Sequence, residues 1–118
     1  MKWEFRDDRP IYSQLVDQIQ RRIASGAYPA GGKLPSVRDL ASEAAVNPNT
    51  MQKAFAELER QGLVYSQRTS GRFITEDLEQ IRLVREKLGA EQIERFLAGM
   101  RELGYSRQDA VDLIHQSE

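Results

Sequence analysis

The sequence contains no cysteine, one tryptophan and one histidine among its 118 residues. The lack of cysteine excludes disulfides and thiolate metal sites. No apolar run approaches the roughly 20 residues that span a bilayer, and the first eight residues lack the apolar segment of a secretory signal. We therefore expect a cytoplasmic protein with no membrane partner.

Motifs that carry catalytic chemistry are also lacking. The sequence has no glycine-rich phosphate loop, no metal-binding cluster and no recognisable pair of nucleophile and base. The single histidine, His115, lies near the end of the chain, where a solvated side chain is the expectation. We expect no cofactor and no enzymatic activity.

Neither sign of charge dominates the chain as a whole, but the balance of charges differs between its two parts. Lysine and arginine number 17 against 18 aspartate and glutamate, a formal net charge of −1. Residues 1–75 carry 11 basic and 8 acidic side chains, whereas residues 76–118 carry 6 and 10. A polyanion is therefore expected to meet the first part, although short segments often differ by a few charges.

The periodicity of apolar residues predicts three helices in the first part. Residues 2–5 alternate polar and apolar, as a short one-sided strand would. A helix follows from Pro10 to Gly26, and Ser36 and Asp39 form a potential capping box for a second. Asn47 and Pro48 are start signals for a third, which ends near Gly62. The buried stripes consist of Ile11, Leu15, Val16, Ile19 and Ile23; Val37, Leu40, Ala41 and Ala44; and Met51, Ala54, Phe55 and Leu58.

Two β-prone runs follow, at residues 63–66 and 72–75, separated by a loop that contains Gly71. They predict a hairpin. The order of helix, helix, turn, helix and hairpin predicts a winged helix-turn-helix. The predicted fold is mainly α with a small β-hairpin. We expect a DNA-binding domain over residues 1–75 and a short α-helical dimerisation tail over residues 76–118.

Polar residues of the third helix are the best candidates for contact with double-stranded DNA. Its first ten residues contain no acid, so amides, hydroxyls and one lysine can approach bases or phosphates. The preceding helix and the hairpin loop add arginines and a glycine that lets a backbone approach closely. Each residue taken alone is more typical of an ordinary solvated surface, so the prediction rests on the three elements together. The predicted DNA-binding residues are Ser36, Arg38, Asn47, Asn49, Thr50, Gln52, Lys53, Arg68, Gly71 and Arg72.

The tail carries apolar stripes that it cannot bury well by itself, which predicts a homodimer. We expect two or three short helices there, the last capped by Ser106 and Asp109. About 40 residues can hardly enclose a small-molecule pocket. An effector could therefore bind between subunits or between domains, or be absent. The predicted dimerisation residues are Ile81, Val84, Leu88, Phe96, Leu97 and Met100.

The combined pattern resembles the DNA-binding domain of the GntR family of bacterial regulators. The matching segments are PIYSQL (10–15), GAYP (26–29), GKLPSVRDLA (32–41), VNPNTMQKAF (46–55), LE (58–59) and GLV (62–64). The short tail with its LGYS (103–106) resembles the YtrA subfamily. The resemblance covers about residues 11–74.

The resemblance implies operator contacts by Arg38, Asn49 and Thr50, and a wing glycine at Gly71 that enters the minor groove. Many relatives carry arginine at the position of Gln52. The wing also departs from the usual Gly-x-Gly-Thr-aromatic pattern, so that Arg72 could add a phosphate contact.

Kinship further implies a repressor of its own operon. The leading hypothesis is a homodimeric, sequence-specific DNA-binding transcriptional regulator. A winged helix used for protein contact is the alternative, and an enzyme is a third reading without a supporting motif.

Overall fold

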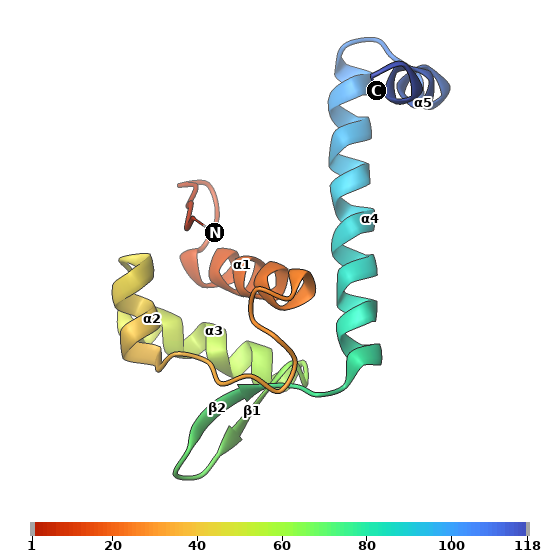
Figure 1. The fold of residues 1–118 in the computed structure, drawn as a ribbon. Coiled ribbons are helices and arrows are strands. Elements are labelled where there is room, and N and C mark those ends of the chain that lie inside the picture. Colours follow the sequence, from red (N-terminus) through yellow and green to blue (C-terminus); the bar gives the residue numbers. More distant parts are fainter. Residues whose placement is uncertain (1, 118) are drawn as a thin grey trace. The chain divides into compact units, whose positions relative to one another are not determined.

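A computed structural model describes residues 2–117, which form five helices and one two-stranded antiparallel sheet (Figure 1). This confirms the predicted winged-helix order. The chain divides into two compact units, Met1–Arg85 and Glu86–Glu118, which we call the winged-helix unit and the tail unit. The elements are α1 (Ile11–Ser25), α2 (Val37–Ala44), α3 (Pro48–Arg60), β1 (Val64–Gln67), β2 (Gly71–Ile74), α4 (Leu78–Glu102) and α5 (Arg107–Gln116).

The core of the winged-helix unit lies between α1, α2, α3 and the sheet. Leu15, Ile19 and Phe55 have no solvent exposure. Complete burial of such side chains removes apolar surface from water, which is the main contribution to the stability of a small domain. The three predicted stripes supply most of this core; Ile11 is exposed and Val37 is partly buried.

The extended segment before α1 does not pair as a β-strand. Its side chains alternate as predicted, with Trp3 and Phe5 half-buried against the core. Its backbone groups bond to glutamine side chains instead. Gln18 Nε2 donates to the Glu4 carbonyl at 2.6 Å, and Gln14 Nε2 donates to the Arg6 carbonyl at 2.8 Å. Side-chain amides satisfy the polar backbone here, which sequence alternation could not reveal.

The loop between α1 and α2 adds a third extended segment to the hairpin, hydrogen-bonded to β2. β1 and β2 pair in antiparallel register from Val64 opposite Ile74 to Gln67 opposite Gly71. On the other side of β2, Leu34 N donates to the Arg72 carbonyl at 2.9 Å, and Ile74 N donates to the Gly32 carbonyl at 2.8 Å. The base of the wing is therefore held on both sides.

The first two turns of α4 belong to the winged-helix unit. Ile81 is 5% exposed within its core, and Val84 packs against that core. Arg85 Nε also donates to the Ala24 carbonyl at 3.1 Å. Ile81 and Val84 were predicted as dimerisation residues, but Ile81 already has its apolar partners inside the chain. The compact units meet between residues 85 and 86, ten residues beyond the predicted boundary.

The tail unit contains the rest of α4 and α5. The expectation of short helices before Ser106 was wrong, because α4 continues through Gly89 and Gly99 for 25 residues. Each glycine costs a helix about 1 kcal/mol, which the surrounding good helix formers offset. The capping box of α5 is confirmed: Ser106 Oγ accepts from Asp109 N at 3.1 Å, and Asp109 accepts from Ser106 N at 2.9 Å.

Apolar side chains of the tail unit are only partly covered. Leu97 is 7% exposed and Ala110 is fully buried. Leu88 and Met100 are half-buried. The large apolar side chains that remain exposed are Ile93, Phe96, Leu103, Tyr105, Leu113 and Ile114.

Candidate nucleic-acid interface

The start of α3 is built by the sequence signals that predicted it. Asn47 Oδ1 accepts from Asn49 N at 2.7 Å, and Pro48 occupies the first turn. The side-chain oxygen of Asn47 therefore serves as a helix cap. Asn49, Gln52 and Lys53 are exposed, whereas Thr50 is half-buried. The exposed polar residues lie beside the positive end of the helix dipole, which favours an anionic partner.

Lys53 is positioned by an aromatic ring from another helix. Its ammonium nitrogen lies 3.9 Å from the centroid of the Tyr12 ring on α1. A cation over an aromatic face is attracted by the ring quadrupole, which restricts the lysine without removing its charge. This contact between α1 and α3 was not foreseen from the sequence.

The start of α2 presents two of the predicted residues to solvent. Ser36 Oγ accepts from Asp39 N at 3.1 Å, so the serine caps the helix as expected. Arg38 follows at the second position of α2 and is exposed. An exposed guanidinium here can form paired hydrogen bonds with a phosphate or a guanine.

The wing loop depends on a glycine conformation. Gly71 has φ +105°, a conformation that side chains of L-residues rarely adopt. A Cβ atom there would lie 3.1 Å from Cε of Lys33, an exposed residue that the sequence analysis had not singled out. Arg68 is also exposed. Arg68 of the wing loop and Lys33 beside it therefore offer cations around a close backbone approach at Gly71.

Arg72 is held inside the winged-helix unit rather than pointing freely from the wing. Its Nε lies 2.6 Å from Oε1 of Glu59, which also accepts from Ser66 Oγ at 2.8 Å. The hydrogen bond from Arg72 lowers the pKa of Glu59, with a smaller lowering contribution from Ser66. Glu59 thus fixes both strands of the wing to the end of α3, a positioning role that sequence reasoning missed.

A cleft of about 680 Å³ joins the start of α2 to the wing. It brings together three predicted residues, Ser36, Gly71 and Arg72, and adds Lys33. Arg38 and the polar residues of α3 do not line it. Three of the predicted contacts therefore line this cleft, whereas Arg38, Arg68 and the polar residues of α3 lie outside it.

Neither a metal site nor a membrane span has support within residues 2–117. Histidine and carboxylate side chains there form no group of three that could hold a metal ion. None of the helices in this part of the chain combines the length and apolar character that crossing a membrane requires. The exposed polar groups and cations suit recognition of a nucleic-acid duplex.

This architecture is that of a winged helix-turn-helix regulator. The chain belongs to the GntR family of bacterial regulatory proteins, whose sequence model matches residues 11–74. It is 40% identical to the HTH-type transcriptional regulator YhcF of Bacillus subtilis, over 94% of this chain and 92% of that protein. It is 36% identical to the HTH-type transcriptional repressor YtrA of the same organism, over 80% and 78% of the two chains. The predicted YtrA-like resemblance is confirmed.

Solved structures of regulators share this fold. A GntR-family transcriptional regulator from Listeria monocytogenes has a TM-score of 0.85 at 38% identity and covers 97% of this chain and all of its own. The DNA-binding domain of AraR, solved in complex with operator ORX1, has a TM-score of 0.57 at 28% identity, over 64% of this chain and 99% of that domain.

Proposed function

We propose that the protein is a homodimeric repressor that binds operator DNA in the cytoplasm through α3, the start of α2 and the wing. The observation that carries this proposal is the exposed start of α3, where polar side chains and Lys53 surround the positive end of a capped helix. A recognition helix of a helix-turn-helix enters the major groove by its N-terminal residues.

We assign a role to each residue of α2 and α3 from the exposure and the chemistry of its side chain. Asn49 and Gln52 have amides that can form paired hydrogen bonds with adenine, and Arg38 can do the same with guanine. Lys53 is assigned to a phosphate because a single ammonium provides charge without planar geometry. Asn47 and Ser36 cap their helices and act through the backbone that they hold in place. Half-buried Thr50 is assigned a contact through its hydroxyl.

The wing is assigned to the minor groove and the flanking phosphates. Arg68 and Lys33 are exposed, whereas Arg72 is already paired with Glu59. We therefore assign the phosphate contacts to Arg68 and Lys33 and give Arg72 the task of holding the wing.

The tail unit supports a dimer. Ile93 is 56% exposed and Phe96 is 44% exposed, and Leu88 and Met100 of the same helix are half-buried. A contiguous set of large apolar side chains on a short helical unit favours association with a second copy. A closed two-fold dimer presents each recognition helix twice, which requires an inverted repeat in the operator.

Repression as the mode of regulation is supported by kinship, and control of the protein's own operon remains part of the proposal. One relative is named a transcriptional repressor, and the AraR domain was solved with an operator. A repressor acts when its dimer covers a promoter, which needs no chemistry beyond sequence-specific binding.

The test starts with genomic fragments selected for binding by the intact protein. Affinity is then measured by fluorescence anisotropy at several salt concentrations for the wild type and for Arg38→Ala, Gln52→Ala and Lys53→Ala. Loss of a base-directed pair is expected to weaken specific binding by about 1–3 kcal/mol. Loss of a phosphate contact by Lys53→Ala should reduce the salt slope by about one unit.

Arg101→Ala is the matched control, because Arg101 is exposed in the tail unit and removal of its charge should leave affinity unchanged. Thermal melts establish that each variant is folded. If no fragment is selected, or if binding hardly varies with salt, the alternative of a winged helix for protein contact is favoured.

A further inference from the structure

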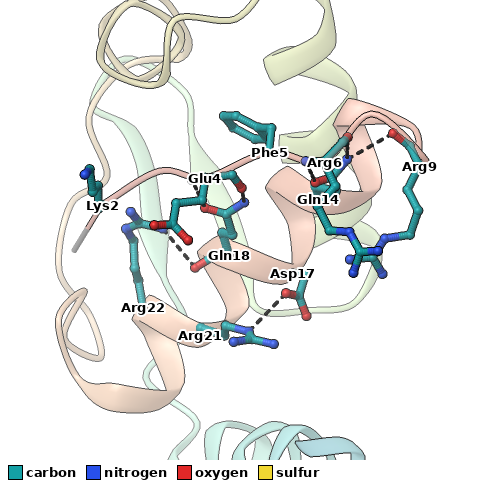
Figure 2. Close-up of a pocket in the computed structure, with 10 residues that line it drawn as sticks. All are labelled: Lys2, Glu4, Phe5, Arg6, Arg9, Gln14, Asp17, Gln18, Arg21 and Arg22. Atoms are coloured by element: carbon teal, nitrogen blue, oxygen red, sulfur yellow. Dashed lines mark hydrogen bonds and ion pairs between the residues drawn. The ribbon is translucent and has the colours of Figure 1, made fainter. Parts of the chain in front are cut away.

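A second and larger cavity, of about 760 Å³, lies in the winged-helix unit between the extended N-terminal segment and α1 (Figure 2). Its size falls within the range of small-molecule sites, about 300–1,000 Å³. Two glutamines of α1 fasten the segment that forms one wall. Gln14 bonds to the backbone N–H and carbonyl of Arg6, and Gln18 bonds to those of Glu4. The wall is thus a fixed part of the unit.

The cavity lies on a different face of α1 from the one that supports α3. Successive residues of a helix are 100° apart, so Asp17 and Arg21 share a face opposite the buried stripe of Leu15, Ile19 and Ile23. That stripe is 0–2% exposed in the core, whereas Arg21 is exposed. DNA that is bound by the start of α3 therefore does not fill this cavity.

The charge of the lining is strongly asymmetric. Two carboxylates, Glu4 and Asp17, face five cations: Lys2, Arg6, Arg9, Arg21 and Arg22. Figure 2 shows Arg6 and Arg9 beside the first turn of α1 and Arg21 and Arg22 toward the other end. Within the described chain Lys2 and Arg9 have no ion-pair partner, while Arg6 pairs with Asp8 at 2.8 Å and Arg21 with Asp17 at 3.0 Å. The surplus of positive charge attracts an anion.

One of these cations is buried in the wall. Arg22 is 5% exposed, and its guanidinium carbon lies 3.6 Å from the centroid of the Trp3 ring. It also donates to the Gln18 carbonyl at 3.2 Å. A charge with little surrounding water interacts more strongly with a ligand than a fully solvated one.

We propose that this cavity is an effector site for a small polyanion, a molecule that carries phosphate or several carboxylate groups. Arg9 and Arg21 bind its charged groups through paired guanidinium hydrogen bonds, and Arg22 adds attraction from the wall. The ligand ties the N-terminal segment more firmly to α1. Because Tyr12 of the same helix contacts Lys53 of α3, this site borders the element that supports the recognition helix.

Calorimetry on the intact protein tests the site with two probes, pyrophosphate and citrate, each at up to about 10 mM in low salt. We expect one site per chain. The double variant Arg9→Gln/Arg21→Gln should weaken binding by at least about tenfold, because two charge-assisted contacts are lost. Binding of pyrophosphate alone identifies a phosphate ligand, binding of citrate alone a polycarboxylate, and binding of both a site that selects by charge.

The control is Arg101→Gln/Arg107→Gln, which removes the same charge from exposed positions in the tail unit. It should bind like the wild type. Trp3 is the only tryptophan of the chain and contacts Arg22, so its fluorescence should change on saturation. The proposal is overturned if neither probe binds, if the Arg9/Arg21 variant binds like the wild type, or if both double variants lose affinity equally. None of these readouts uses operator DNA, so the site can fail while the proposed regulator stands.

Discussion

The winged-helix unit and the tail unit differ in how far they bury their large apolar side chains. Phe55 of α3 has no solvent exposure, whereas Phe96 of α4 is 44% exposed. The first unit surrounds its apolar residues with three helices, a sheet and the start of α4. The second has only part of α4 and one ten-residue helix. From this comparison we expect the first unit to be stable alone and the tail unit to bury its apolar residues against a further surface.

The largest expected effect is on the buried phenylalanine. Phe55→Ala should lower the free energy of unfolding by about 3–5 kcal/mol, because it leaves a cavity in a closed core. Phe96→Ala is the matched substitution in the tail unit and should cost the winged-helix unit little. Urea unfolding followed by circular dichroism measures both. Equal losses would remove the distinction between the two units.

Charges on the exposed face of the tail should separate the subunits. We expect Phe96→Glu/Met100→Glu to convert a dimer into a monomer at micromolar concentration, because carboxylates would be buried against apolar groups. Sedimentation velocity gives the masses. Leu78→Glu is the control: Leu78 is 69% exposed at the start of α4, in the winged-helix unit. A wild type that is monomeric, or a double variant that stays dimeric, contradicts this interface.

Two truncations locate the boundary between the units. A chain that ends at Arg85 keeps Ile81 and Val84 and should remain a folded monomer. A chain that ends at Thr75 loses both and should be less stable by about 2–4 kcal/mol, from the lost burial of Ile81 and the partial burial of Val84. Thermal and urea melts compare them. Equal stability would place the boundary at Thr75/Glu76, as the sequence predicted.

The smallest effect concerns the ion pair that holds the wing. The pKa of Glu59 is lowered in the folded state. The stabilising contribution of the ionised Glu59 is therefore present above the ordinary carboxyl pKa and is lost as the pH falls through the lowered pKa. Glu59→Gln should remove on the order of 0.5 kcal/mol at neutral pH, because both partners are partly in water. The variant should then lose less stability than the wild type on acidification. Glu102→Gln, an exposed residue of the tail unit, should behave like the wild type.

Local signals predicted the winged helix because each element carries its own start or stop. Asn47 and Ser106 cap the helices that they were expected to cap, and Gly62 has the positive φ of a helix end. Such local signals could not predict contacts between residues that are far apart in the sequence. The periodicity of α4 placed Ile81 on an apolar stripe. It could not show whether this stripe packs against the core of its own chain or against a second subunit.

The same limit applies to the candidate site. Exposure of Arg38, Asn49 and Lys53 follows from helix periodicity, so these residues could be chosen from the sequence. The pairing of Arg72 with Glu59 depends on where the hairpin meets the end of α3, 13 residues earlier. The contact of Lys33 with the wing depends on the loop that adds an edge to β2.

Footprinting of the intact protein on a selected genomic fragment tests the central claim most directly. Two symmetry-related copies of α3 should protect an inverted repeat whose half-sites lie about 10 base pairs apart, in successive major grooves. Arg38→Ala should lose this protection at concentrations where Arg101→Ala keeps it. Protection of a single asymmetric half-site, or of a site without an inverted repeat, would contradict recognition of DNA by two copies of α3.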